Sequence, residues 1–130
     1  MMNILVVLEN KNSSIHRMSL EAISGAQQIG KECGLSVGIL ALGEKASVLA
    51  AEASQYSVEE VLSVENENLN SYTADGYSAA VAQVISAENP DYVFFGHTYQ
   101  IRDYVPRISA KLNRPFLNDV VSYTVDGDKP

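Results

Sequence analysis

Short apolar runs alternate with longer segments of helical periodicity along this chain of 130 residues. We expect strands at 4–8, 37–42, 60–64 and 92–95. The first two runs are apolar on both faces, which is typical of strands covered by helices on each side. Repeated strand–helix alternation predicts an α/β fold in three αβα layers, with a mostly parallel sheet and right-handed crossovers. Counted along the chain, the strands are expected in the spatial order 3-2-1-4.

Helical segments separate these strands, and their ends carry recognisable signals. The first is expected to begin with Ser19 as its N-cap and to end at Gly34. The second is expected to place Ala46, Leu49, Ala50 and Ala53 on one face. The third is expected to end before Asn89 and Pro90, because a residue that precedes proline avoids helical backbone angles.

Pro106 determines where we expect the last helix to begin. Proline in a helix interior costs about 3 kcal/mol, because it lacks the N–H group and its ring clashes with the preceding turn. A start at Asp103, acting as the N-cap, or at Tyr104 would place Pro106 in the first turn, where the missing N–H has no partner. Residues 116–125 are then expected to extend along the edge of the sheet.

The composition excludes several classes of function. Sixteen acidic residues against nine basic ones give a net charge of −7, which argues against a nucleic-acid partner. Cys33 is the single cysteine and lies on an apolar helical stripe, so we expect it to be buried. We see no leader pattern and no apolar run of membrane-spanning length, and we therefore expect a cytoplasmic protein.

Polar residues gather where two neighbouring strands of the expected sheet end. In open α/β sheets, ligands bind outside the carboxyl ends of the strands, where the strand order reverses. Residues 9–12 follow the first strand, and the fourth strand is followed by Gly96, His97, Thr98 and Arg102. The sequence contains neither GxGxxG nor GxxxxGK[ST]. We therefore do not predict phosphate binding by a glycine-rich loop.

Three roles remain open for the polar cluster that follows the fourth strand. In a structural role, Gly96 ends the strand, Asp103 caps the helix and Arg102 pairs with a carboxylate. In a second role, the candidates for a subunit or domain contact are Gly96, His97, Thr98 and Arg102. In a third, Arg102 or the free amides of the helix meet an anion.

No pattern typical of a catalytic or metal site occurs in the sequence. His16 and His97 are the only histidines, and neither belongs to an HxxxH pattern. We expect a loop hydrogen bond for His97 and solvation for His16. A GxSxG pattern is also missing, so we predict no catalytic residues and no metal ligands. The sequence favours a binding or scaffold module over an enzyme.

Several stretches resemble the alpha subunits of electron transfer flavoproteins. They are the opening 3–9, the helix at 20–26 and the stretch 91–98. The most specific match is 102–112, which is similar to that family's RD–x–x–P–R–[hydrophobic]–[small]–A–x–L helix, and it is followed by 118–120, similar to the D-[hydrophobic] strand. The resemblance extends over essentially the whole chain.

The resemblance implies a Rossmann-like fold of the adenine-nucleotide-alpha-hydrolase type and an electron carrier in place of an enzyme. Residues 1–130 would be the N-terminal domain of the alpha subunit, a scaffold that contacts the beta subunit. FAD would be held by a C-terminal domain absent from this chain, so no cofactor is expected here, and AMP bound by the family's beta subunit is not transferred. The heterodimer would carry electrons from dehydrogenases, such as the acyl-CoA dehydrogenases of fatty acid oxidation, to a quinone reductase or another acceptor.

The alternative is a stand-alone adenine-nucleotide-binding protein of the universal-stress type. That family commonly has a glycine-rich phosphate loop late in the chain, whereas no glycine lies between Gly96 and Gly127 here. This difference favours the electron transfer flavoprotein. We also expect weak self-association of the isolated domain, because an interface without its partner leaves an apolar patch.

Overall fold

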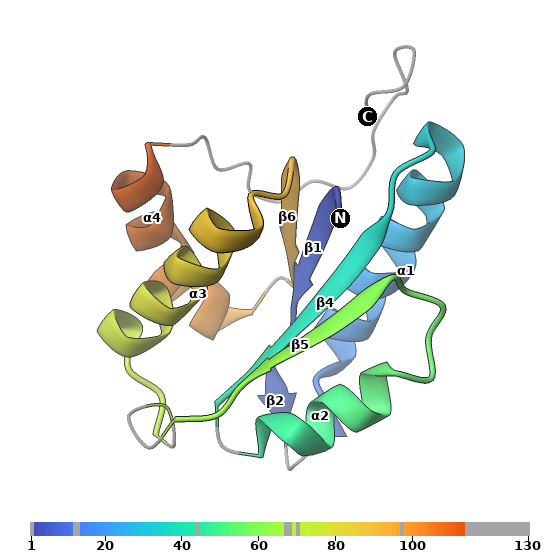
Figure 1. Cartoon of the computed structure of the whole chain (residues 1–130). Helices are drawn as coiled ribbons and strands as arrows, with labels where there is room; N and C mark the ends of the chain where they lie inside the picture. The colour runs from blue at the N-terminus through green and yellow to red at the C-terminus, as the bar shows by residue number, and fades with distance from the viewer. Residues whose placement is uncertain are drawn as a thin grey trace.

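A parallel four-stranded sheet lies between two layers of helices (Figure 1). This computed structural model describes residues 2–11, 14–43, 45–66, 69, 71–96 and 98–113. The sheet has the order β5-β4-β1-β6, and its strands are β1 (Ile4–Val7), β4 (Val37–Leu42), β5 (Glu60–Val64) and β6 (Tyr92–Phe95). The three-layer αβα prediction and the expected strand order 3-2-1-4 are both confirmed.

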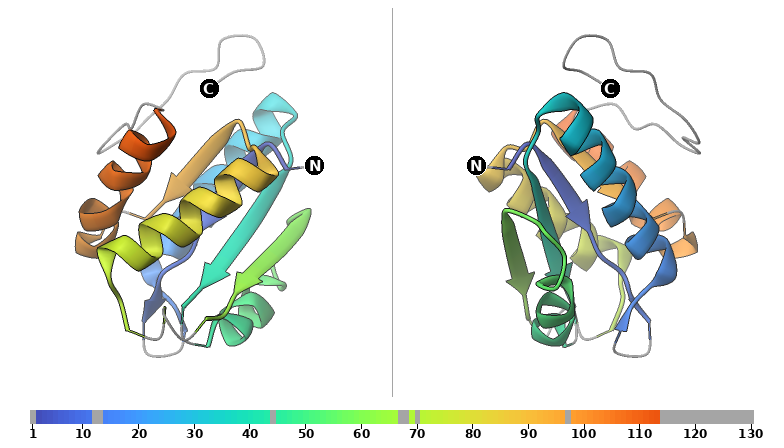
Figure 2. Two further views of the ribbon diagram at one scale, coloured as in Figure 1. Left: turned by 60° about the vertical axis from the view of Figure 1, so that its left-hand side comes forward. Right: turned by 90° about the vertical axis from the view of Figure 1, so that its right-hand side faces the viewer.

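The helices divide between the two faces of the sheet (Figure 2). They are α1 (Arg17–Cys33), α2 (Ala46–Ala53), α3 (Ala74–Glu88) and α4 (Tyr99–Leu112). Helices α1 and α2 cover one face, and α3 and α4 cover the other. Strand β1 contributes side chains to the apolar core on each face of the sheet. Ile4 and Val6 pack toward α1, while Leu5 and Val7 pack toward α3 and α4. This central position explains why its sequence is apolar without alternation.

Helix α1 begins earlier than its sequence predicts. Its N-cap is His16, whose Nδ1 accepts a hydrogen bond from the Met18 N–H at 3.0 Å. The expected cap, Ser19, is buried inside the helix, and its hydroxyl oxygen accepts the backbone N–H of Glu9. The end of the helix is confirmed: Gly34 takes a left-handed conformation with φ of 70°, which glycine adopts without steric cost.

A short hairpin follows β1 where the sequence predicts a loop. Its strands are β2 (Asn10–Lys11) and β3 (Ser14–Ile15), which pair antiparallel. The carboxylate of Glu52 on α2 accepts the Ser14 hydroxyl at 3.0 Å and the Ile15 N–H at 3.3 Å. Two-residue strands carry no periodicity that a sequence pattern can detect, and the hairpin depends on this contact with α2.

Helix α4 corrects the prediction that it begins at Asp103 or Tyr104. It begins at Tyr99, one turn earlier, and Thr98 is its N-cap. The Thr98 hydroxyl oxygen accepts the Ile101 N–H at 3.1 Å. Pro106 therefore lies inside the helix, on its exposed side, where water can reach the carbonyl that loses its hydrogen bond. The longer helix buries Ile101 against the sheet, which offsets part of the cost of proline.

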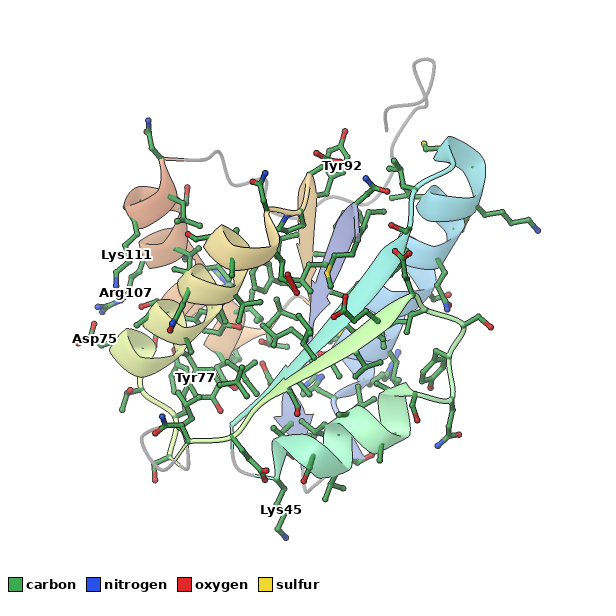
Figure 3. All side chains as sticks on the ribbon, viewed as in Figure 1. Lys45, Asp75, Tyr77, Tyr92, Arg107 and Lys111 are labelled. Atoms are coloured by element: carbon green, nitrogen blue, oxygen red, sulfur yellow. The ribbon has the colours of Figure 1, made fainter. Side chains whose placement is uncertain are left out.

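Side-chain contacts join the start of α3, and Tyr72 just before it, to α4. The Tyr72 hydroxyl donates to Asp103 at 2.7 Å, so Asp103 joins two elements and does not cap a helix as predicted. Arg107 and Asp75 form an ion pair of 2.7 Å, and Figure 3 shows both side chains between the two helices. The predicted end of α3 before Asn89 is confirmed.

Cys33 is buried at the end of α1, as the apolar stripe predicts. The expected edge segment 116–125 lies outside the described residues. In the part of the chain that the structure describes, no helix is both long and apolar enough to span a membrane.

Candidate functional site

The strand order reverses between β1 and β6. From β1 the chain crosses to β4 and β5 on one side, and it then returns to place β6 on the other side of β1. Such a reversal opens a crevice at the carboxyl ends of the two strands, and many folds of this architecture bind ligands there. Here we call this region the switch point and define it by Glu9, His16, Ser19, Gly96 and Thr98.

Glu9 occupies the centre of the switch point. One carboxylate oxygen, Oε1, accepts the Thr98 hydroxyl at 2.6 Å, while Oε2 lies 3.7 Å from Nε2 of His16. The backbone N–H of Glu9 donates to the Ser19 hydroxyl oxygen at 2.9 Å. The side chain of Glu9 is only 13% exposed. A single carboxylate therefore connects the end of β1 with the first residues of both α1 and α4.

His16 is part of this arrangement, which corrects the expectation that it is solvated. Its Nδ1 accepts the Met18 N–H, and its side chain is 20% exposed. An acceptor nitrogen carries no proton of its own, so the ring proton is on the nitrogen that faces Glu9. No sequence pattern indicated this role, because histidine is an unusual N-cap and Glu9 lies outside the helix that His16 caps.

Gly96 lets the first turn of α1 reach the end of β6. A Cβ atom on Gly96 would lie 2.8 Å from the carbonyl carbon of Met18 and 2.9 Å from its oxygen. Real Cβ atoms do not approach backbone atoms so closely, and a larger residue would push the helix away. The backbone that comes close to Gly96 thus belongs to α1 of the same chain.

The remaining predicted residues differ in their surroundings. Thr98 is half-buried and uses its hydroxyl both to cap α4 and to bind Glu9. Arg102 is exposed, and no carboxylate among the described residues pairs with it. His97 lies outside the described residues. Sequence reasoning did not single out Tyr99, which begins α4 and is 89% exposed.

An aromatic cluster lies beneath the switch point, on the side of α3 and α4. Tyr104 is fully buried and contacts the rings of Phe95, Tyr77 and Tyr72 at centroid distances of 6.1, 5.8 and 6.2 Å. Burial raises the pKa of the Tyr104 phenol well above its ordinary value, and the negative charge of Glu9 raises it further. The phenol therefore stays protonated, and the cluster is a packing element.

The family model described as the electron transfer flavoprotein domain matches residues 4–129. The chain belongs to this family. An electron transfer flavoprotein subunit alpha from Bacillus subtilis is 35% identical over 124 residues, which are 95% of this chain and 38% of that protein. A subunit alpha from Clostridium acetobutylicum is 25% identical, over 93% of this chain and 36% of that protein.

An acryloyl-CoA reductase electron transfer subunit beta from Anaerotignum propionicum is also similar. It is 29% identical over 128 residues, which are 98% of this chain and 35% of that protein. The electron transfer flavoprotein domain described here therefore spans little more than a third of the length of these relatives.

The switch point of this electron transfer flavoprotein domain does not fit the pyrophosphate of a flavin or the phosphate of a nucleotide. Phosphate groups bind where backbone N–H groups and cations converge. Here the Glu9 carboxylate lies among the helix starts, and it already accepts the Thr98 hydroxyl. The negative charge of Glu9 would repel a phosphate at this position, and the Thr98 hydroxyl already donates its hydrogen bond to Glu9.

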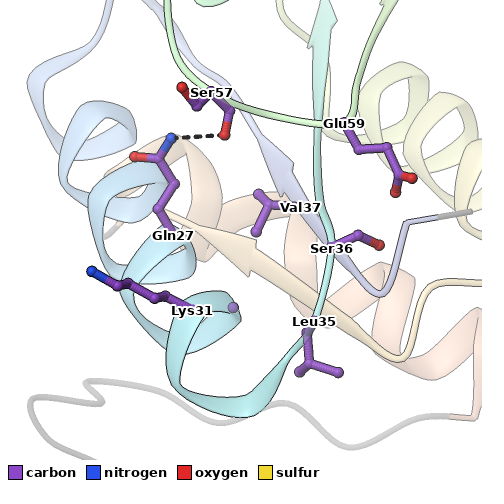
Figure 4. Close-up of a pocket in the computed structure, with 8 residues that line it drawn as sticks. Gln27, Lys31, Leu35, Ser36, Val37, Ser57 and Glu59 are labelled. Atoms are coloured by element: carbon purple, nitrogen blue, oxygen red, sulfur yellow. Dashed lines mark hydrogen bonds between the residues drawn. The ribbon is translucent and has the colours of Figure 1, made fainter.

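A pocket of about 630 Å³ lies at the opposite end of the sheet, between the end of α1 and the start of β4 (Figure 4). Gln27 bridges its rim by donating to the Ser57 carbonyl at 3.3 Å. The pocket is shallow and open, and Lys31 and Glu59 are exposed to water. Among the described residues no group of three or more His, Cys, Asp or Glu side chains could hold a metal ion.

Proposed function

We propose that this chain is the N-terminal scaffold domain of an electron transfer flavoprotein alpha subunit, and that it contacts the beta subunit. The complete alpha subunit binds FAD in a region beyond residues 1–130. The heterodimer carries electrons from dehydrogenases, such as acyl-CoA dehydrogenases, to a quinone reductase or another acceptor in the cytoplasm. The chain itself contributes shape and contact surface, and it contributes no catalytic group.

The family match over residues 4–129 is the observation that carries this proposal. The relatives named above are subunits of electron transfer proteins, and each is nearly three times as long as the matched region. A matched domain that covers about a third of such a subunit leaves most of the length for a flavin site. Two of these relatives are named as flavoproteins, and we propose that the flavin of the complete subunit is FAD.

The closed switch point supports a scaffold role. Its buried polar groups bind one another, as the Glu9–Thr98 hydrogen bond illustrates. The exposed residues beside it are suited to a protein contact instead. Tyr99 and Arg102 are one helical turn apart at the start of α4, and tyrosine and arginine are enriched at the centres of protein interfaces. We therefore retain Gly96, His97, Thr98 and Arg102 as the proposed region of subunit or domain contact, and we add Tyr99.

Spectroscopy and titration of the purified chain test the proposal. We expect no flavin absorbance, no saturable binding of FAD or ATP, and saturable binding of the electron transfer flavoprotein beta subunit from the same organism. Stoichiometric FAD binding would place the flavin site inside these 130 residues. Tight ATP binding would instead favour a nucleotide-binding protein, and failure to bind the beta subunit would contradict the scaffold role.

A further inference from the structure

The outer side of α3 is unusual for a helix that faces water. Its residues 76–87 contain no charged side chain, in a protein in which 19% of residues are charged. Exposed positions recur at helical spacing along this stretch, and all of them are small or uncharged: Ala79, Gln83, Ser86 and Ala87. Solvent-facing helices ordinarily carry interspersed charges. The outer sides of the other long helices follow that rule, with Arg17, Glu21 and Lys31 on α1 and Arg102, Arg107 and Lys111 on α4.

An apolar groove borders this side of α3. Its volume is about 340 Å³, and it lies between α3 and the end of β5, where its lining residues are Val64, Ala80, Gln83, Val84 and Ala87. Gln83 is the one polar residue among them. Strand β5 is the sheet edge on this side and pairs with β4 alone among the described residues. Its Leu62 and Val64 belong to the core beneath α3, yet both remain partly exposed. We call the exposed positions of α3 together with this groove the α3 face.

We propose that the α3 face packs against the beta subunit in a permanent interface. This inference rests on the proposed function and names the surface that the partner covers. The cores of protein interfaces are depleted in charged residues, and permanent interfaces are more apolar than transient ones. Encounters between redox partners are small and are steered by charge, which the α3 face does not supply. A dehydrogenase is therefore a poor match for this surface.

A second copy of the chain fits the α3 face less well, in keeping with the weak self-association expected of the isolated domain. Each copy carries a net charge of −7, and association of two such copies brings like charges together. Two of the relatives are named as the alpha subunit of an electron transfer flavoprotein, so a different subunit is the expected partner. The fitting occupant is a beta-subunit surface that is apolar and uncharged at its centre. Small residues such as Ala79 and Ala80 would let its backbone approach closely.

Tyr72, which precedes α3, contacts the first turns of α4. The Tyr72 hydroxyl, just before α3, lies 3.4 Å from the Gln100 carbonyl and donates to Asp103 at 2.7 Å. Tyr72 is itself 38% exposed. We infer that one partner covers the uncharged α3 face together with the proposed contact residues Tyr99 and Arg102 at the start of α4.

Charge substitutions on two helices test the assignment. Gln83→Lys with Ala87→Lys adds two charges to the α3 face, at positions that are exposed in the isolated chain. Ser24→Lys with Gln28→Lys adds the same two charges, with the same spacing, to the outer side of α1. Each protein is titrated with the beta subunit by calorimetry, and urea unfolding verifies that each variant folds.

We expect the Kd for the beta subunit to rise at least about a hundredfold in the α3 variant, because an interface core does not tolerate unpaired charge, and to change less than about threefold in the α1 variant. Equal, tight binding by both variants would show that the α3 face is not the surface that contacts the beta subunit, while the proposed function would stand. Failure of the unmodified chain to bind would overturn both. Self-association lost only in the α3 variant, with beta-subunit binding unchanged, would overturn the proposal in favour of a second copy.

Discussion

At the switch point, polar groups converge and bind one another, whereas the α3 face has hardly any polar chemistry and remains open. Glu9 connects the starts of two helices there and is largely removed from water. On the α3 face, small uncharged side chains border a groove that no described element fills. The comparison shows that a cluster of polar residues after the strands can serve the fold, while an uncharged stretch of exposed helix can mark a surface for a partner.

If the switch point holds α1 against β6, a side chain added at Gly96 should lower the free energy of unfolding more than any other change proposed here. Gly96→Ala places a Cβ atom 2.8 Å from the Met18 backbone, so we expect the free energy of unfolding to fall by about 2–3 kcal/mol. The matched control is Gly25→Ala on α1, where a Cβ would meet nothing within 4 Å. That change should stabilise the helix by about 0.5–1 kcal/mol. Urea unfolding measures both, and equal effects would argue against a close joint.

The hydrogen bond between the Glu9 carboxylate and Thr98 should make the next largest contribution to the free energy of unfolding. A double-mutant cycle with Glu9→Ala and Thr98→Val isolates their hydrogen bond of 2.6 Å. We expect a coupling free energy of about 1.5–2 kcal/mol, because the acceptor is charged and partly buried. Thr98→Ser keeps the hydroxyl and should retain most of the stability. Additive single-mutant effects would mean that Glu9 does not hold α4.

Much of the architecture follows from patterns that the sequence shows directly. Apolar runs and helical periodicity predict the sheet, its order and the end of α1 at Gly34, since burial on both faces leaves a clear signal. The predicted starts of α1 and α4 were wrong. Both helices begin at residues that contact Glu9 in the switch point, and Glu9 lies far from Thr98 in sequence. Local capping preferences cannot detect such a contact.

Alkaline pH should weaken the core beside the switch point. The pKa of Tyr104 is raised in the folded state, chiefly by burial. The unfolded chain releases this proton above about pH 10, while the folded chain retains it, so stability is complete below that pH and falls as the pH rises. We expect a loss of up to about 1.4 kcal/mol per pH unit from this group. Tyr104→Phe should flatten the dependence, measured by urea unfolding at several alkaline pH values, and an unchanged slope would contradict the assignment.

Substitutions on the α3 face should have the smallest effect on folding. Gln83→Lys and Ala87→Lys change exposed side chains, and we expect the free energy of unfolding to change by less than about 0.5 kcal/mol. Thermal and urea unfolding measure this directly. A loss comparable with that of Gly96→Ala would mean that the α3 face already packs within the chain, and the contrast between the two regions would disappear.

Calorimetric titration of the purified chain with the beta subunit, and separately with FAD, tests the scaffold role most directly. We expect saturable binding of the beta subunit and no binding of FAD, because the switch point is closed and the α3 face is open. Heat of binding with FAD and none with the beta subunit would contradict the scaffold role, since the chain would then be a ligand-binding domain.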